Sequence, residues 1–173
     1  MGSHTSAFAA DVRGALDAFR RIIQALRSSS RDAERRVGLS AAQLFALQQI
    51  ASMHGASVSD LSARTFTHQS SVSVVIQRLV ARKLVAKTLA RDDRRRVRLA
   101  ITDAGRTLLR RSPEPVQERL IAGIATLSVS DRRALVTALT TIADTLAVGD
   151  TAPPMLFEDA RTAGIRRKRR AAR

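Results

Sequence analysis

Cysteine is absent from all 173 residues of the chain. Its absence excludes disulfide bonds, thiolate-bound metals, iron–sulfur clusters and peroxide sensing through a thiol. No uncharged apolar run reaches about eighteen residues, and the N-terminus lacks the basic segment, apolar segment and cleavage site of a secretory signal. We therefore expect a soluble, cytoplasmic protein that does not insert into a membrane.

Patterns for catalysis and metal binding are also missing. The three histidines, His4, His54 and His68, are too far apart in the sequence for helical metal-ligand spacing. We find no serine–histidine–aspartate elbow, glycine-rich phosphate loop or Walker-type lysine. The neighbouring carboxylates Asp92 and Asp93 lie in an arginine-rich segment that we expect to be solvated, which does not suit general acid–base chemistry. We predict no enzyme activity, no metal and no cofactor.

Acidic residues are few compared with basic ones. The chain has 15 Asp and Glu against 30 Lys and Arg, which gives a formal charge of +15. This excess favours a polyanionic partner, with nucleic acid first and an acidic membrane surface as the alternative. Seven basic residues lie in the segment 161–173, whose few apolar residues predict a flexible tail.

Helical periodicity is the main pattern in the first half of the chain. Apolar residues in the segment 12–26 recur every three or four positions, which predicts a helix with one apolar seam that the serines 28–30 end weakly. Ser40 and Ser57 are predicted N-caps of a second and a third helix. A fourth helix begins near His68 or Gln69, with one buried stripe formed by Val72, Val75, Ile76, Leu79 and Val80.

A β-hairpin follows the fourth helix. The segment 84–90 is its first arm, 91–96 is a charged apex, and 97–101 alternates in period two as a return strand does. Two short helices followed by such a hairpin are typical of a winged helix-turn-helix.

The last helices carry further apolar seams. Thr102 or Asp103 caps a fifth helix, which we expect to be long and bent because Pro113 and Pro115 interrupt it before it resumes over 116–127. A sixth helix starts at Ser130 and ends before Gly149 and the pair Pro153-Pro154. Beyond these prolines we predict no contribution to the core.

The hairpin apex and the residues after it carry the most specific motif. Asp93-Arg94-Arg95, followed by Ile101-Thr102-Asp103-Ala104-Gly105, resembles the wing signature of the multiple antibiotic resistance regulator (MarR) family, in which Asp-x-Arg leads into Leu-Thr-x-x-Gly. Ile101 replaces the leucine of the family. The segment 69–73 with Arg78-Leu79-Val80 also looks like the recognition helix of the family, and the match spans roughly residues 39–146.

The resemblance implies a mainly α-helical fold with a small β-hairpin wing and six helices. It implies an N-terminal dimerisation helix over residues 1–37, a winged helix-turn-helix DNA-binding domain over 38–102, C-terminal dimerisation helices over 103–149 and a basic flexible tail over 150–173. Apolar seams at 12–26, 120–127 and 135–146 fit a homodimer. Packing within one chain would explain some of the same residues.

The fourth helix and the wing contain the predicted DNA contacts. Small and hydrogen-bonding side chains suit a helix that approaches base edges in the major groove. We assign this role to Gln69, Ser70, Ser71, Ser73, Val74 and Gln77. By the family pattern Arg95 enters the minor groove and Asp93 orients it. Phosphate contacts are assigned to Arg78, Arg91, Arg94, Arg96 and Arg98. A solvated polar surface without a partner would explain either set.

These assignments predict a transcription regulator of the repressor type that binds double-stranded DNA as a homodimer. Its site is expected to be an inverted repeat of about 16 to 20 base pairs. Many members of the family are released from DNA by a small aromatic or phenolic effector. Candidate effector-cleft residues are Phe19, Phe45, Met53, His54 and Phe66, although an ordinary core explains them as well.

Two other classes of function fit the same sequence. One is an architectural or nonspecific DNA-binding protein without a ligand response, and the other is an interaction module that does not need DNA. The first predicts little preference between DNA sequences, and the second predicts none for DNA over another polyanion. We expect loss of residues 161–173 to lower DNA affinity similarly on all sequences and to flatten its salt dependence.

Overall fold

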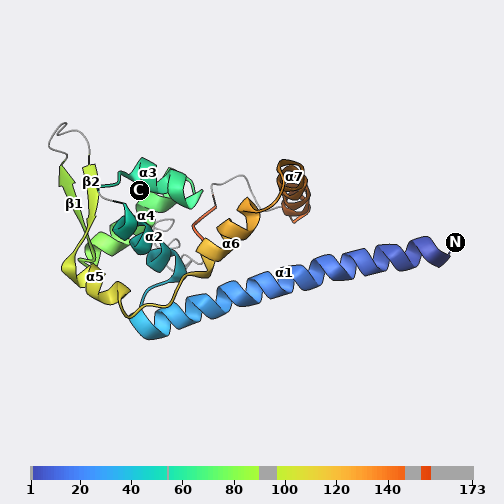
Figure 1. The fold of residues 1–173 in the computed structure, drawn as a ribbon, viewed down its shortest axis with the longest axis horizontal. Coiled ribbons are helices and arrows are strands. Elements are labelled where there is room, and N and C mark those ends of the chain that lie inside the picture. Colours follow the sequence, from blue (N-terminus) through green and yellow to red (C-terminus); the bar gives the residue numbers. More distant parts are fainter. Residues whose placement is uncertain (1, 54, 90–96, 147–152, 157–173) are drawn as a thin grey trace, which may run out of the picture.

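A computed structural model describes residues 2–53, 55–89, 97–146 and 153–156 of the chain. A long helix, α1 (Gly2–Val37), leads at its C-terminal end into a group of short helices and a two-stranded hairpin (Figure 1). The short elements that follow it in this group are α2 (Ala41–Ser52), α3 (Val58–Thr65), α4 (Gln69–Ala81), β1 (Val85–Leu89) and β2 (Val97–Ile101). The chain then continues through α5 (Asp103–Leu109), α6 (Val116–Ala125) and α7 (Val129–Thr145). The fold is mainly α-helical with a β-hairpin wing, as the sequence predicts.

Side-chain caps begin the two helices that precede α4. The Ser40 hydroxyl accepts from the Gln43 amide at 3.2 Å, and the Gln43 side chain accepts from the Ser40 amide at 3.4 Å. Ser57 and Asp60 form the same reciprocal pair at 3.1 and 2.9 Å. Each capping box satisfies two backbone N–H groups that a helix leaves without partners at its start. Both predicted caps are confirmed.

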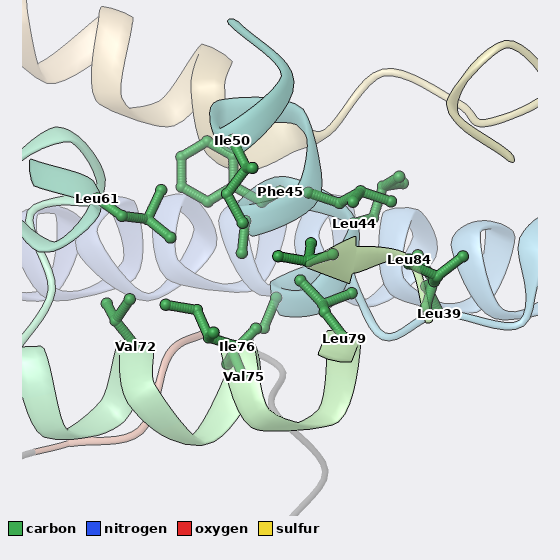
Figure 2. Close-up of a cluster of buried hydrophobic side chains, with 14 of the residues drawn as sticks. Leu39, Leu44, Phe45, Ile50, Leu61, Val72, Val75, Ile76, Leu79 and Leu84 are labelled. Carbon is green, nitrogen blue, oxygen red and sulfur yellow. The ribbon is translucent and has the colours of Figure 1, made fainter. Parts of the chain in front are cut away.

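The hydrophobic core surrounds α2, which contacts α1, α3, α4, α5 and β2. The predicted stripe of α4 points into this core, with Val72, Val75 and Leu79 fully buried. Figure 2 shows these side chains directed toward Ile50 of α2 and Leu61 of α3. Burial of each such side chain contributes about 1.5–3 kcal/mol. The core therefore fixes which face of α4 points inward.

The hairpin is antiparallel and is tied to the loop before α3. Val85 pairs with Ile101, and the Leu99 amide donates to the Ala56 carbonyl at 2.8 Å. At the base of the hairpin, the Thr102 hydroxyl accepts from the Gly105 amide at 3.1 Å and caps α5. The predicted hairpin and the predicted Thr102 cap are both confirmed.

The serines at 28–30 do not end the first helix, contrary to the prediction. Asp32 forms ion pairs with Arg35 and Arg36 at 2.9 and 3.1 Å, and Ala33 is buried in the core. Packing of these last turns outweighs the weak helix propensity of serine. The helix ends at Val37, and Gly38 follows at φ +64°, the left-handed conformation common after a helix end.

The predicted long, bent helix is two helices, α5 and α6. Residues 110–115 lie outside both helices, because proline lacks an N–H donor and keeps the residue before it out of helical geometry. Within the described residues the helix count is therefore one higher than the six predicted. The next helix, α7, is capped by Ser128 rather than begun at Ser130, and the Ser128 hydroxyl accepts from the Asp131 amide at 3.1 Å.

Residues beyond Pro154 do contribute to the core, and the opposite prediction was wrong. Met155 is only 4% exposed and belongs to the main hydrophobic cluster. Met155, Leu156 and Phe157 form a run of only three apolar residues after two prolines, which is too short to show periodicity, so the pattern in the sequence could not identify Met155 as a core residue.

Two helices leave their apolar seams uncovered in the protomer. On α1, Val12, Leu16 and Ile23 are 42–47% exposed. On α7, Leu139 and Ile142 are 41 and 43% exposed, and no residue of the helix is buried. Within the described residues, every helix is too short or too polar to span a membrane.

Candidate nucleic-acid interface

A tight turn connects α3 to α4 and sets the angle between them. The Thr65 hydroxyl donates to the Leu61 carbonyl at 2.8 Å, and the Thr67 amide donates to the Ser62 carbonyl at 3.1 Å. Between them Phe66 adopts φ +51°, a left-handed conformation that is strained for a non-glycine residue. These bonds hold α4 in one orientation against α3, as a helix-turn-helix requires.

The exposed face of α4 presents short polar side chains around one apolar residue. At 100° per residue, Ser70, Val74 and Gln77 lie opposite the buried stripe, and all three are exposed. Gln69 is also exposed, in the first turn of the helix. Since α4 contains no acidic residue, nothing on this helix repels a phosphate-bearing partner.

Three other predicted contacts lie on the flanks of α4. Ser71, Ser73 and Arg78 are each half-buried. The Ser71 hydroxyl donates to the Pro153 carbonyl at 2.8 Å, so it is engaged by the C-terminal segment of the same chain. The structure therefore separates the six predicted groove residues into an exposed set and a flanking set.

Most of the predicted wing contacts lie outside the described residues. This holds for Arg91, Asp93, Arg94, Arg95 and Arg96, whose roles stay predictions. The two hairpin strands on either side of this segment in the sequence are described, and their last pair is Leu89 with Val97.

Arg98 has a structural role that sequence reasoning missed. Its Nη1 donates to the Gly55 carbonyl at 2.8 Å, and its side chain is half-buried. Gly55 adopts φ +70°, and a Cβ there would approach the Arg98 Cδ at 3.2 Å. Arg98 thus ties the wing to the loop before α3. No local signal could reveal this contact, because the two residues are 43 positions apart.

The structure brings together three of the five candidate cleft residues. Phe45, Met53 and Phe66 line a cleft of about 610 Å³ between α2, α3 and α6. Phe45 and Phe66 also line a neighbouring cleft of about 350 Å³, together with Met155. Phe19 lines neither, and His54 lies outside the described residues.

The larger cleft also has a polar side that the sequence did not indicate. Arg64 and Glu118 line it, and the Arg64 Nε donates to the Gln49 side chain at 3.1 Å. Among the described residues, no group of three or more histidine or acidic side chains is arranged to hold a metal ion.

Comparison with protein families agrees with the helix-turn-helix and the wing. A model described as the MarR family matches residues 37–96, which contain α2, α3, α4 and the first hairpin strand. Over these residues the chain is similar to the MarR family. The family named from the wing signature is therefore confirmed, and the family is one of transcription regulators. No curated protein sequence matches the chain.

Solved structures share the fold over a longer span. The S. aureus MepR–DNA complex is 18% identical, with a TM-score of 0.52, and the match covers 75% of this chain and 94% of that one. The transcriptional regulator BldR from Sulfolobus solfataricus is 19% identical, with a TM-score of 0.51 and coverage of 84% and 99%. A MepR-like protein complexed with pseudoligands is 18% identical, with a TM-score of 0.50 and coverage of 79% and 94%. At these identities the likeness shows the winged-helix fold alone.

Proposed function

We propose that this MarR-family protein is a sequence-specific, DNA-binding transcription regulator that acts as a homodimer. The observation that carries the proposal is the exposed face of α4, formed by Ser70, Val74 and Gln77 and held by the core opposite it. The net charge of +15 and the arginine-rich sequence 91–96 between the two hairpin strands support a polyanionic partner. MepR, which has the same fold, was solved in complex with DNA.

The side chains on this face match the chemistry of the major groove. A glutamine amide such as that of Gln77 can bond both polar atoms of an adenine edge, and an apolar side chain such as Val74 can contact a thymine methyl group. Short serines let the helix approach the bases closely. In the proposal the wing adds Arg95 in the minor groove, oriented by Asp93, and the other apex arginines bind phosphates.

The exposed seams of α1 and α7 support the homodimer. Their apolar residues recur at helical spacing on one side of each helix, which suits a partner helix. In the proposal residues 1–37 and 103–149 form the dimer region, and residues 38–102 form the DNA-binding domain. A twofold dimer places its two α4 helices about one DNA turn apart, so the site is an inverted repeat of about 16 to 20 base pairs.

Selection of bound fragments from the source genome tests the proposal. Affinity for the best fragment is then compared with affinity for scrambled DNA of the same length near physiological salt. We expect one inverted repeat with at least about a thousandfold preference. Uniform recovery with a steep salt dependence would instead identify an architectural protein. A reporter placed behind the selected site distinguishes a repressor from an activator.

A ligand response is favoured by one specific observation. Phe45, Met53 and Phe66 line one cleft, whose charged lining residues are Arg64, Asp60 and Glu118. Its apolar surface matches an aromatic ring, and Arg64 is the cation available to the carboxylate of an aromatic acid. Titration of salicylate against the DNA complex should lower DNA affinity and raise the melting temperature of the free protein. No change in either quantity would remove the ligand response from the proposal.

A further inference from the structure

Open clefts separate α6 from the helices of the winged-helix domain. One cleft of about 610 Å³ lies between α2, α3 and α6, and another of about 400 Å³ is lined by residues of α2, of the segment 112–115 and of α6. Helix α6 packs against α1, and Ile121 is its one residue that packs against the main hydrophobic cluster of the described chain. The angle between α6 and α4 is therefore set by little direct packing between them.

The segment Pro153–Leu156 bridges α4 and α6. The Pro153 carbonyl accepts from Ser71 of α4 at 2.8 Å, and the Leu156 carbonyl accepts from Gln117 of α6 at 3.4 Å. Between them Met155 is 4% exposed and lines a cleft together with residues of α2, the α3–α4 turn and α6. Figure 1 shows this short orange-red segment beside α6. We call Pro153–Leu156 the anchor.

Gln117 is an unfavourable residue for its buried position on α6. Its side chain is 5% exposed, and its Oε1 has no hydrogen-bond partner among the described residues. An unpaired buried polar atom destabilises a fold, whereas a leucine of similar size would pack there without that penalty. The bond that the Gln117 amide does make runs from Nε2 to the anchor. This bond assigns to Gln117 the role of holding the anchor on α6.

The anchor lies on a flank of α4 and leaves its exposed face open. Ser71 lies about 100° around the helix from Ser70 and from the buried Val72, between the exposed face and the core. Ser70, Val74 and Gln77 stay exposed although the anchor is in place. The anchor can therefore remain bound while α4 contacts a partner, which favours a positioning role over autoinhibition.

We propose that the anchor fixes the angle between α4 and α6 and thereby the spacing of the two DNA half-sites that the dimer accepts. The proposal rests on the proposed function, in which α4 reads DNA and α6 belongs to the dimer region. It assigns Met155, Ser71 and Gln117 as positioning residues. Each base pair inserted between two half-sites moves them about 3.4 Å apart and rotates them by about 35°. A dimer with a fixed angle between α4 and α6 therefore fits one spacing best.

Affinity for inverted repeats of altered spacing tests the proposal in the full-length chain. The duplexes contain the selected repeat, the same repeat with two extra central base pairs, or a single half-site. We expect the two extra base pairs to weaken binding of the unaltered chain by about a hundredfold, because the second half-site can no longer be engaged. In Met155→Ala the same insertion should weaken binding only about tenfold, with unchanged affinity for the single half-site. Leu156→Ala is the matched control, because this neighbouring side chain is 51% exposed, and it should behave as the unaltered chain does.

Three further variants separate positioning from loss of stability. Val85→Ala removes buried volume from the hairpin, outside the lining of the anchor cleft, and should leave the spacing preference unchanged. Met155→Leu keeps a similar apolar volume and should retain the preference. Gln117→Leu should relax the preference without lowering the free energy of unfolding. An unchanged preference in both Met155→Ala and Gln117→Leu, or a relaxed one in Val85→Ala, would overturn the proposal.

Ser71→Ala distinguishes the two roles that the structure and the sequence suggest for this residue. If Ser71 holds the anchor, the variant tolerates the two extra base pairs better and binds the single half-site as tightly as the unaltered chain. Weaker binding to the half-site with an unchanged spacing preference would assign Ser71 to base reading and overturn its role here.

A distance measurement tests the anchor without DNA. Because the chain has no cysteine, Lys87→Cys on β1 and Arg119→Cys on α6, both at exposed positions, place two spin labels at chosen sites. The labelled chain is diluted with unlabelled chain, and double electron–electron resonance gives the distribution of distances between the labels. We expect a broader distribution in Met155→Ala than in the unaltered chain or Leu156→Ala. Equal widths would overturn the anchor and leave DNA recognition standing, whereas failure to select an inverted repeat would reject sequence-specific regulation and leave this measurement valid.

Discussion

The helices around α2 have apolar patterns similar to those of α1 and α7, but the two groups differ in how much of the pattern is buried. In α4 four of the five residues of the predicted stripe are buried within the protomer, and the fifth, Val80, is half-buried against the core. In α7 the stripe at Leu139, Ile142 and Leu146 is 41–69% exposed. Helical periodicity thus shows that a helix has a packing partner, but it does not show whether that partner belongs to the same chain.

The apolar seam of helix α1 is buried at one end of the helix and exposed further along it. Ala33, near its C-terminal end, is buried in the main hydrophobic cluster, and Leu26 is also buried. Val12 and Leu16, on the same seam further toward the N-terminus, are 42 and 47% exposed. One continuous seam therefore passes from the core of the protomer to a surface that we propose a second copy covers.

A charge introduced on the exposed apolar seam of α7 is expected to have the largest effect, which is on dimerisation. Leu139→Glu would bury an unpaired carboxylate in each half of the proposed dimer, which is strongly unfavourable. We expect the dimer to weaken by about a thousandfold, or about 4 kcal/mol. Val136→Glu is the matched control, because Val136 is 64% exposed and lies about 90° around the helix from the middle of the stripe. Sedimentation equilibrium measures the dimer dissociation constant of both variants. An equal weakening of the dimer in the two variants would contradict a dimer formed through this stripe.

Gly105, at the base of the hairpin, and Gly14, on the exposed part of α1, differ in the space around them. A Cβ at Gly105 would collide with the Leu84 carbonyl and approach Ile101 Cγ1 at 2.8 Å, whereas a Cβ at Gly14 would meet nothing within 4 Å. Gly105→Ala should lower the free energy of unfolding by about 3 kcal/mol. Gly14→Ala should raise it by up to about 1 kcal/mol through helix propensity. Urea denaturation gives both values, and a stabilising Gly105→Ala would show that the hairpin base has room to adjust.

Removal of one side chain from the exposed face of α4 should affect binding rather than folding. Gln77→Ala is expected to cost about 2 kcal/mol on the operator and nothing on scrambled DNA, because only base recognition is removed. Gln24→Ala, which changes an exposed glutamine on α1, is the control. Fluorescence anisotropy with both DNAs makes the comparison. An equal loss on the two DNAs would place Gln77 at the phosphates instead.

The smallest effect is expected where the wing joins the loop before α3. Arg98→Ala removes the bond from Nη1 to the Gly55 carbonyl and should lower the free energy of unfolding by about 1.5 kcal/mol. Arg13→Ala on the exposed surface of α1 should leave it unchanged. Thermal unfolding measures this change. A shallower salt dependence of DNA binding with unchanged stability would support the phosphate contact predicted from the sequence.

Local features of the fold could be predicted because their physics is local. Ser40, Ser57 and Thr102 cap helices through bonds to residues three positions away, so the pattern that predicts each cap lies next to it. The stripe of α4 and the alternation of the hairpin are likewise contained within one element. The exposed face of α4 then follows as the side opposite its stripe.

Contacts between distant segments could not be predicted. Arg98 meets Gly55 across 43 positions, and Ser71 meets Pro153 across 82. The extension of α1 past its serines also depends on distant packing, because the core buries Ala33. None of these contacts leaves a periodic or compositional signal.

By itself the sequence determined a mainly helical, basic chain with capped short helices, one inward-facing stripe on α4 and a hairpin beside it. These features depend on backbone propensity, side-chain periodicity and charge, which act over a few residues. Only the tertiary structure decided where α1 ends, that Arg98 braces the wing and that Met155 seats the C-terminal segment against the helix proposed to read DNA. Such contacts form when segments far apart in the chain bury surface together, and burial depends on the whole fold.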